Sequence, residues 1–183
     1  MTRVVETRES ESATLCKACG LCCTGHLYAW AALEPKEIAT TRALGLTVVQ
    51  PAPKRQGFSL PCPRWDGQCT IYTHSDKPEV CDAFQCKLLK EVQAEQTPVA
   101  QALTVVDRAK EMIRELEALS PASSRKSFRV SLIEQVKQLE RAAVPGEDGL
   151  AFRLKAGVLL IFVGREFGVE GLFNEAKKDE SSN

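Results

Sequence analysis

The chain has 183 residues, 44% of them hydrophobic, and its 24 basic and 24 acidic side chains give a formal charge of zero. This length fits one ordinary domain, or a small metal-binding module joined to a helical unit. The longest apolar run, Ala156 to Val163, is far too short to span a membrane. No block of basic residues indicates a nucleic-acid partner.

The composition also includes eight cysteines, all in the first half of the chain. The N-terminal residues lack the apolar core of a secretory signal peptide, so we expect a cytoplasmic protein in a reducing compartment. Cysteine clusters in that compartment are more often metal sites or redox centres than disulfide frameworks. We therefore expect metal ligation, with four disulfides or plain buried thiols as the alternatives.

Residues 1–13 are polar and charged and show no apolar period, which predicts a flexible leader. Four cysteines follow within eight residues, at Cys16, Cys19, Cys22 and Cys23. The two-residue gap between Cys16 and Cys19 lets a tight turn bring both sulfurs to one ion, and the glycine after Cys19 can adopt the positive φ that such turns often require. Neighbouring side chains normally point apart, so Cys22 and Cys23 indicate two ions or one multinuclear cluster.

The segment after these cysteines predicts short connecting elements. Apolar residues 26–33 fit a buried strand or a helical turn. Residues 35–45 begin with proline and end with glycine, which favours a short helix, and the prolines and glycine of residues 50–57 favour a loop. His26, and His74 further on, are candidate ligands. With eight thiols at hand, we expect a structural position for His26 and a solvated loop position for His74.

The second cysteine group begins with Cys62 and Cys69. The Asp66-Gly67 pair between them is a strong signal for a two-residue hairpin loop. In that register, Cys62 and Cys69 lie on one face of the hairpin as diagonal neighbours, which would let them share a metal ion. Prolines on both sides of Cys62 limit this segment to an edge or irregular strand.

Cys81 and Cys86 complete the set. Residues 76–79 have the spacing of a capping box with a proline in the first turn, which predicts a helix from about Lys77. Cys81 and Cys86 are five residues apart, which on a continuous helix separates their directions by about 140°. Either the helix breaks between them or they serve different sites.

Taken in order, these motifs resemble the CxxCxxCC cysteine-cluster (YkgJ-like) family, whose members are described as zinc- or iron-chelating domains. The resemblance covers about residues 14–90 and includes all eight cysteines. It rests on four motifs: Cys16-x2-Cys19-x2-Cys22-Cys23, Pro-Cys62-Pro, Gly67-x-Cys69-x-Ile71-Tyr72 and Lys77-Pro78-x2-Cys81-x2-Phe84-x-Cys86. Lys77 departs from the family, in which an arginine precedes the proline. The resemblance implies metal binding, and because a flagellin lysine methylase carries a similar cluster, an enzymatic role stays open.

All-cysteine sites suit zinc and iron-sulfur clusters alike. Four thiolates around zinc leave no open position, which indicates structural use, whereas an iron-sulfur cluster indicates electron transfer, sensing or radical chemistry. Of the two, we favour zinc. Each four-thiolate zinc site would carry a net charge of about −2, or about −4 for two sites. Basic residues close in sequence could offset this charge: Lys17, Lys54, Arg55, Arg64, Lys77 and Lys87.

Two amphipathic segments follow the cysteines, and each is predicted to be a helix: residues 97–119 and about 124–143. A third segment, residues 150–167, contains a long apolar run, and its length favours a buried helix, with a strand within it as the alternative. Their short connections favour antiparallel packing. Residues 177–183 are predicted to be a disordered tail. The expected domains are a leader over residues 1–13, a cysteine module over 14–95, a three-helix unit over 96–170 and a flexible tail over 171–183.

The overall prediction is a mainly α fold with a small irregular β-hairpin, in which a metal-stabilised cysteine module packs on a helical bundle. The expected function is metal binding, structural or chelating, with the helices open to a protein partner. The alternative is an iron-sulfur redox or methyl-transfer enzyme, or a maturation factor. The motifs of zinc proteases, serine hydrolases and nucleotide-binding enzymes do not occur. The eight predicted metal ligands are Cys16, Cys19, Cys22, Cys23, Cys62, Cys69, Cys81 and Cys86.

Overall fold

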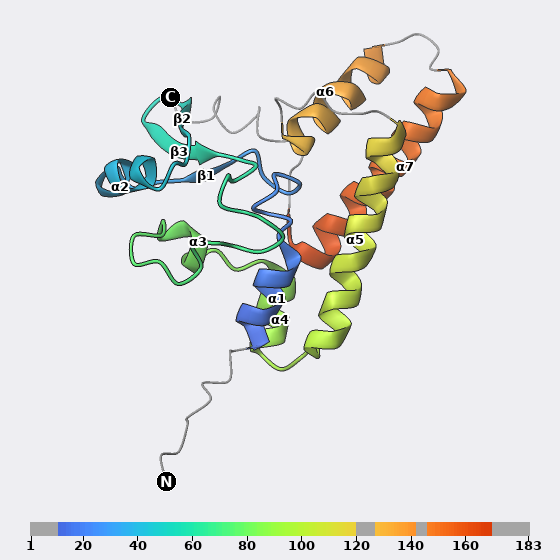
Figure 1. Cartoon of the computed structure of the whole chain (residues 1–183). Coiled ribbons are helices and arrows are strands. Elements are labelled where there is room, and N and C mark those ends of the chain that lie inside the picture. The colour runs from blue at the N-terminus through green and yellow to red at the C-terminus, as the bar shows by residue number, and fades with distance from the viewer. Residues whose placement is uncertain (1–10, 120–126, 142–145, 170–183) are drawn as a thin grey trace, which may run out of the picture.

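The computed structural model describes residues 11–119, 127–141 and 146–169. These residues form seven α-helices, one 3-10 turn and a three-stranded antiparallel sheet. In Figure 1 the sheet lies on one side of the molecule and the long helices α5 and α7 lie on the other, with α1 and α4 between them. The predicted fold class, mainly α with a small β element and a cysteine region packed on C-terminal helices, is confirmed.

Helix α1 (Glu11–Cys19) replaces two predictions at the start of the chain. The leader predicted over residues 1–13 was wrong for residues 11–13, which lie in α1, and residues 1–10 lie outside the described residues. The expected tight turn between Cys16 and Cys19 is the last turn of α1 instead. The helix forms because Leu15, only 2% exposed, docks into the core. It ends at Gly20, whose φ of 69° is the left-handed conformation typical of a helix C-terminus.

The sheet contains β1 (Trp30–Ala32), β2 (Val48–Ala52) and β3 (Arg55–Ser59) in the order β1-β3-β2. Strand β1 confirms the strand alternative for the apolar run at 26–33. The loop predicted over residues 50–57 was wrong, because β2 and β3 form the hairpin of this protein there. The proline in β2 is tolerated since β2 is an edge strand with an irregular register between Val49 and Ala52.

The helix predicted over residues 35–45 is confirmed as the 3-10 turn η1 (Pro35–Glu37) followed by α2 (Ile38–Ala43). The backbone N–H of Glu34 donates to Oε2 of Glu37 at 2.9 Å, which caps the N-terminus. The other carboxylate oxygen of Glu37 accepts from the N–H of Glu79 at 2.6 Å. This bond ties the segment between the two cysteine groups to the segment that carries the later cysteines.

The hairpin predicted around Asp66 and Gly67 was wrong. The described residues show a single bridge there, between Trp65 and Cys69, and the N–H of Asp66 donates to the carbonyl of Gln68 at 3.0 Å. Trp65 therefore faces Cys69, whereas a two-residue loop at Asp66 and Gly67 would pair Trp65 with Gln68. The pairing does not extend to Cys62. The prolines on both sides of Cys62 lack the N–H groups that a longer ladder requires.

Two short helices carry the last two cysteines. Helix α3 (Val80–Ala83) begins three residues later than predicted, because Lys77 lies in a turn in which its N–H donates to the carbonyl of His74. The predicted break between Cys81 and Cys86 is present. Cys86 is the N-cap of α4 (Lys87–Gln93), and its sulfur accepts from the N–H of Leu89 at 3.4 Å.

The three predicted C-terminal helices are confirmed as α5 (Val99–Leu119), α6 (Phe128–Arg141) and α7 (Glu147–Phe167). Figure 1 shows that α5 and α7 run antiparallel. The predicted start of α6 at residue 124 and the predicted tail lie outside the described residues. No helix among the described ranges combines the length and the apolarity needed to cross a membrane.

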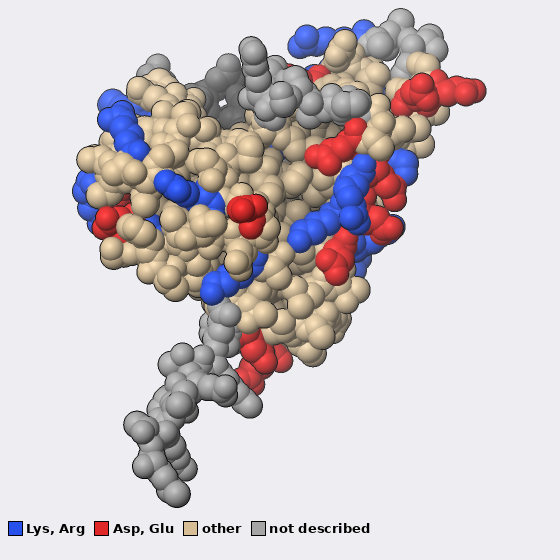
Figure 2. All heavy atoms as spheres, in the orientation of Figure 1, with Lys and Arg blue, Asp and Glu red and all other residues tan. Residues whose placement is uncertain are grey.

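Two hydrophobic clusters organise the molecule. The helical core joins α1, α4, α5, α6 and α7, with Leu15, Leu88, Val106 and Leu159 among its buried residues. The sheet core is smaller and comprises Leu33, Leu44, Leu46, Phe58, Leu60 and Ile71. On the face drawn in Figure 2, lysines and arginines are interspersed with acidic residues, and most of the surface is uncharged.

Candidate metal centre

All eight cysteines are free thiols, and they come from four backbone segments. Cys16 and Cys19 lie on the last turn of α1, and Cys22 and Cys23 lie in the turn that follows it. That turn is closed by the N–H of Thr24, which donates to the carbonyl of Gly20 at 2.9 Å. The early and late segments meet directly, because the N–H of Cys62 donates to the carbonyl of Cys23 at 2.7 Å.

Four cysteines gather against the helical core, and we call them the helix-side group: Cys16, Cys19, Cys22 and Cys86. Cys19, Cys22 and Cys86 pack directly against that core. Burial raises the pKa of Cys19 to about 12, and the charges of Cys86 and Cys16 add to this rise. Burial also raises the pKa of Cys22 well above its ordinary value, with Cys19 and Cys86 next among the causes. These thiols are therefore close enough to oppose each other's ionisation.

The other four form the sheet-side group: Cys23, Cys62, Cys69 and Cys81. Cys62 and Cys69 pack against the sheet core. Burial raises the pKa of Cys81 to about 12, and the next causes are Cys62 and Cys69. The pKa of Cys23 is raised in the same order, by burial, then by Cys62 and Cys69. The strongest sulfur partners of the adjacent Cys22 and Cys23 therefore differ, although Cys23 also raises the pKa of Cys22.

Cys16 is influenced by the charges of both groups. Burial raises the pKa of Cys16 most, followed by the charges of Cys86 from the helix-side group and Cys69 from the sheet-side group. Cys16 and Cys81 are the two cysteines that reach the surface, whereas the other six are partly buried. The eight thiols, which we call the sulfur patch, therefore influence one another's ionisation between the two cores.

No group of three or more His, Cys, Asp or Glu side chains within the described ranges is already arranged to hold a metal ion. The donor set nevertheless fits a thiophilic cation chemically. Neighbouring thiolates repel one another and burial disfavours their charge, so this many sulfurs can ionise together only around positive charge. Cysteine thiolate is the ligand that zinc and iron-sulfur clusters share.

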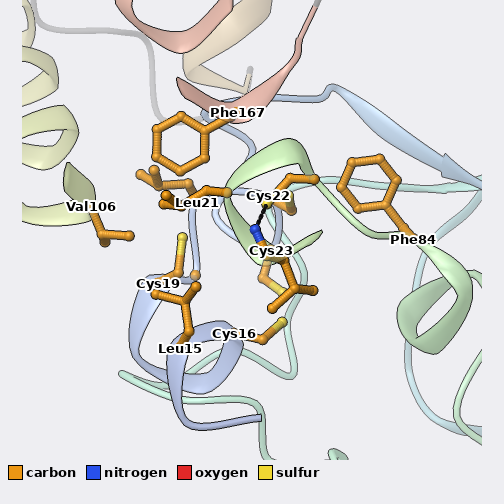
Figure 3. Close-up of a pocket in the computed structure, with 13 residues that line it drawn as sticks. Leu15, Cys16, Cys19, Leu21, Cys22, Cys23, Phe84, Val106 and Phe167 are labelled. Carbon is orange, nitrogen blue, oxygen red and sulfur yellow. Dashed lines mark hydrogen bonds between the residues drawn. The ribbon is translucent and has the colours of Figure 1, made fainter. Parts of the chain in front are cut away.

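A small cavity of about 50 Å³ lies beside the helix-side group. Figure 3 shows Cys16, Cys19, Cys22 and Cys23 around this cavity, with the ring of Phe167 above them and the ring of Phe84 to the right. One enclosed water needs on the order of 10–15 Å³. The cavity therefore has room for an ion or a few waters beside the sulfurs, and none for a nucleotide-sized cofactor.

Lys77 places a buried positive charge next to both groups. Its side chain is 5% exposed, and its Nζ donates at 2.6 Å to the carbonyl of Tyr72 and to Oδ1 of Asp82. The same Nζ lies 4.3 Å from the ring centre of Tyr72, and its charge works against the rise in the pKa of Cys16 and of Cys81. Lys77, the position that departs from the family pattern, thus supplies positive charge near Cys16 and Cys81, and Asp82, its ion-pair partner, acts in the opposite direction.

The other basic residues named from the sequence divide by position. Nζ of Lys17 lies 4.4 Å from the ring centre of Tyr72, the ring that Lys77 also approaches. Arg64 donates from Nε to the carbonyl of Leu44 at 2.6 Å, and its charge lowers the pKa of Cys62. Lys54 and Arg55 are exposed at the tip of the hairpin, and Lys87 bonds to α7.

Both histidine rings make contacts outside the sulfur patch. Nδ1 of His26 lies 2.6 Å from the hydroxyl of Thr24, Nε2 lies 3.6 Å from Glu117, and the ring packs on Phe128. Burial lowers the pKa of His26, and the nearby carboxylate of Glu117 opposes this shift. His74 is exposed, and its Nδ1 accepts from the N–H of Asp76 at 3.1 Å. These contacts match the structural position expected for His26 and the loop position expected for His74.

Three residues around the patch were not singled out from the sequence. Trp65 covers Gly20, and Phe84 and Phe167 border the cavity. Phe84 belongs to the last cysteine motif, which could have marked it. Phe167 could not have been found, because it reaches the cavity only through the packing of α7 against α4.

Residues 15–103 match the model of a family described as CxxCxxCC, "putative zinc- or iron-chelating domain". This part of the chain belongs to the CxxCxxCC family. The CxxCxxCC domain contains all eight cysteines and extends into the first turn of α5, and membership in the family supports metal binding. The comparisons with curated proteins and with solved structures gave no significant match.

Proposed function

We propose that this protein is a metal-binding protein with two four-thiolate sites, one formed by the helix-side group and the other by the sheet-side group. The observation that carries the proposal is that Cys19, Cys22 and Cys86 pack against the helical core and Cys62 and Cys69 pack against the sheet core. Cys22 and Cys23 also have different strongest sulfur partners. In this proposal each group closes around one ion, and zinc is preferred to iron because four thiolates complete its tetrahedral shell.

The role proposed for the ions is structural. The sulfur patch lies where the helical core and the sheet core approach, so two ions would add bonds between segments that are far apart in sequence. A closed four-thiolate site offers no position to a substrate, and the cavity beside it accommodates only a few atoms. Lys77 and Arg64 supply positive charge where the bound sites would be net negative.

Anaerobic purification, metal analysis and an absorption spectrum test this function. The expected result is a colourless protein with about two zinc ions per chain, the number that two closed sites of four thiolates require. A brown protein with acid-labile sulfide would overturn the zinc assignment and favour the iron-sulfur alternative, redox or methyl-transferring.

The assignment of Cys22 and Cys23 to separate sites has its own test. Cys22→Ser and Cys23→Ser should each lower the metal content by about one ion, and the double variant should lose about two, because each serine opens a different site. The matched control is Ala18→Ser, an exposed position on α1 between two cysteines, which should keep both ions. If the second serine removes no further metal, the two cysteines share one site.

A further inference from the structure

Helix α7 has an apolar face that no described residue covers. Its inner face carries residues of the helical core, among them Phe152, Leu159 and Val163, all 4% exposed or less. On the outer face four large side chains are exposed: Leu150 at 51%, Leu154 at 63%, Val158 at 58% and Ile161 at 74%. Their spacing of four, four and three residues places them in one stripe along the helix. Single exposed apolar residues are ordinary, but a continuous stripe marks an interaction surface.

Charged residues of opposite sign close the two ends of this stripe. Glu147 lies one turn before Leu150, and Arg165 lies one turn after Ile161, both on the same side of the helix. Both are exposed, and the side chain of Arg165 is 79% exposed although its Nε lies 2.8 Å from Oε1 of Glu166. A guanidinium has five N–H donors, so Arg165 can bind a second carboxylate as well.

Read from either end, the stripe consists of one charged residue, four apolar residues and one residue of the opposite charge. We propose that α7 packs antiparallel against α7 of a second copy of this chain, about a two-fold axis near Ala156. Leu154 then faces Val158 of the partner subunit, Leu150 faces Ile161 of the partner subunit, and Glu147 faces Arg165 of the partner subunit. A two-fold interface requires such self-complementarity, because the same patch serves both copies.

The helix surface leaves room for this approach. Gly157 borders the stripe, and no described atom lies within 4 Å of a Cβ built on it. The 21 residues of α7 make a helix about 31 Å long. A contact strip about 10 Å wide along it would bury roughly 600 Å² in total, below the roughly 1,200–2,000 Å² of a stable complex. The dimer is therefore weak and depends on concentration.

Sedimentation velocity of the metal-loaded full chain, over about 1–100 µM, tests the proposal. The wild type should shift toward the dimer as concentration rises, and Leu154→Glu should remain monomeric because it places two buried charges at the centre of the interface. The matched control is Arg153→Glu, an exposed neighbour outside the stripe, which should dimerise like the wild type. Unchanged metal content and helical signal would show that Leu154→Glu is folded.

Charge reversal tests the antiparallel register. Glu147→Arg and Arg165→Glu should each weaken dimerisation by about tenfold or more, because each places like charges opposite one another. The double variant should recover most of the wild-type affinity, since the pair is restored with its signs exchanged. A wild type that stays monomeric at every concentration overturns the proposal, and this includes a stripe covered by residues 170–183 of the same chain or by another protein. A dimer that survives Leu154→Glu overturns it too.

Discussion

Gly20 lies directly under the indole of Trp65. A Cβ at this glycine would stand 2.0 Å from Cζ2 of the ring, and the backbone is left-handed with φ at 69°. The ring therefore packs on the bare backbone that follows Cys19, and it joins the loop between Cys62 and Cys69 to the end of α1. Gly67 has nearly the same backbone, with φ at 67°, but no described atom lies within 4 Å of its Cβ position.

These two glycines make a matched test of that packing. Gly20→Ala should lower the free energy of unfolding by about 2–5 kcal/mol, the sum of a left-handed alanine and an overpacked contact. Gly67→Ala should lower it by only about 1–2 kcal/mol, because it carries the backbone cost alone. Urea unfolding of the metal-loaded variants, with metal content measured in parallel, gives both values. Equal losses would show that the contact with Trp65 contributes little.

Helix α6 reaches the cysteine region through one buried arginine. Arg129 is 2% exposed, and its guanidinium donates to the carbonyl of Leu27 and lies 5.8 Å from the ring centre of Tyr28. Its own N–H donates to the carbonyl of Gly25 at 3.3 Å. Helix α6 therefore packs against α7 and also anchors the segment that follows Cys22 and Cys23.

Arg129→Met should lower the free energy of unfolding by about 1–3 kcal/mol, the cost of leaving the carbonyl of Leu27 buried without this charged donor. Arg141→Met, at the exposed end of the same helix, should change it by less than about 0.5 kcal/mol. Thermal unfolding of both variants beside the wild type measures the difference. Similar values for the two variants would mean that the buried guanidinium is not a structural link.

At the scale of the whole molecule, the cysteine region and the C-terminal helices share one core. Leu15, Leu21 and Leu27 from the cysteine region lie in the same cluster as Val106 and Phe167 from the helices. Three of the cysteines of the helix-side group pack against that cluster. Metal binding and the packing of α5 and α7 are therefore expected to be coupled.

Removal of the metal should destabilise the whole described structure, not the cysteine region alone. A metal present at about 1,000 times its dissociation constant stabilises a folded protein by about 4 kcal/mol. Chelation from that concentration should therefore lower the free energy of unfolding by about the same amount. Circular dichroism during heating should show one transition at a lower temperature, and added zinc should restore it. A helical transition that stays in place after chelation would indicate two independent domains, divided as predicted near residue 95.

The sequence alone determined the C-terminal helices, the set of eight cysteines and the family. Apolar spacing predicted α5 and α6 because each helix must bury one side, and length favoured a helix for α7. The metal ligands themselves stay a prediction. Local signals failed where two structures share one spacing: the two-residue gap between Cys16 and Cys19 fits a tight turn and a helical turn equally. They also failed around Asp66, where a strong turn signal was opposed by neighbouring prolines.

Only the tertiary structure decided how the cysteines divide. Spacing along the chain groups Cys22 with Cys23, yet in space Cys22 lies with Cys19 and Cys86 against the helical core, and Cys23 lies with the cysteines near the sheet core. Contacts between residues more than 60 positions apart leave no periodic pattern in the sequence. They arise because two separate apolar clusters must both exclude water, and the sulfur atoms lie where those clusters meet.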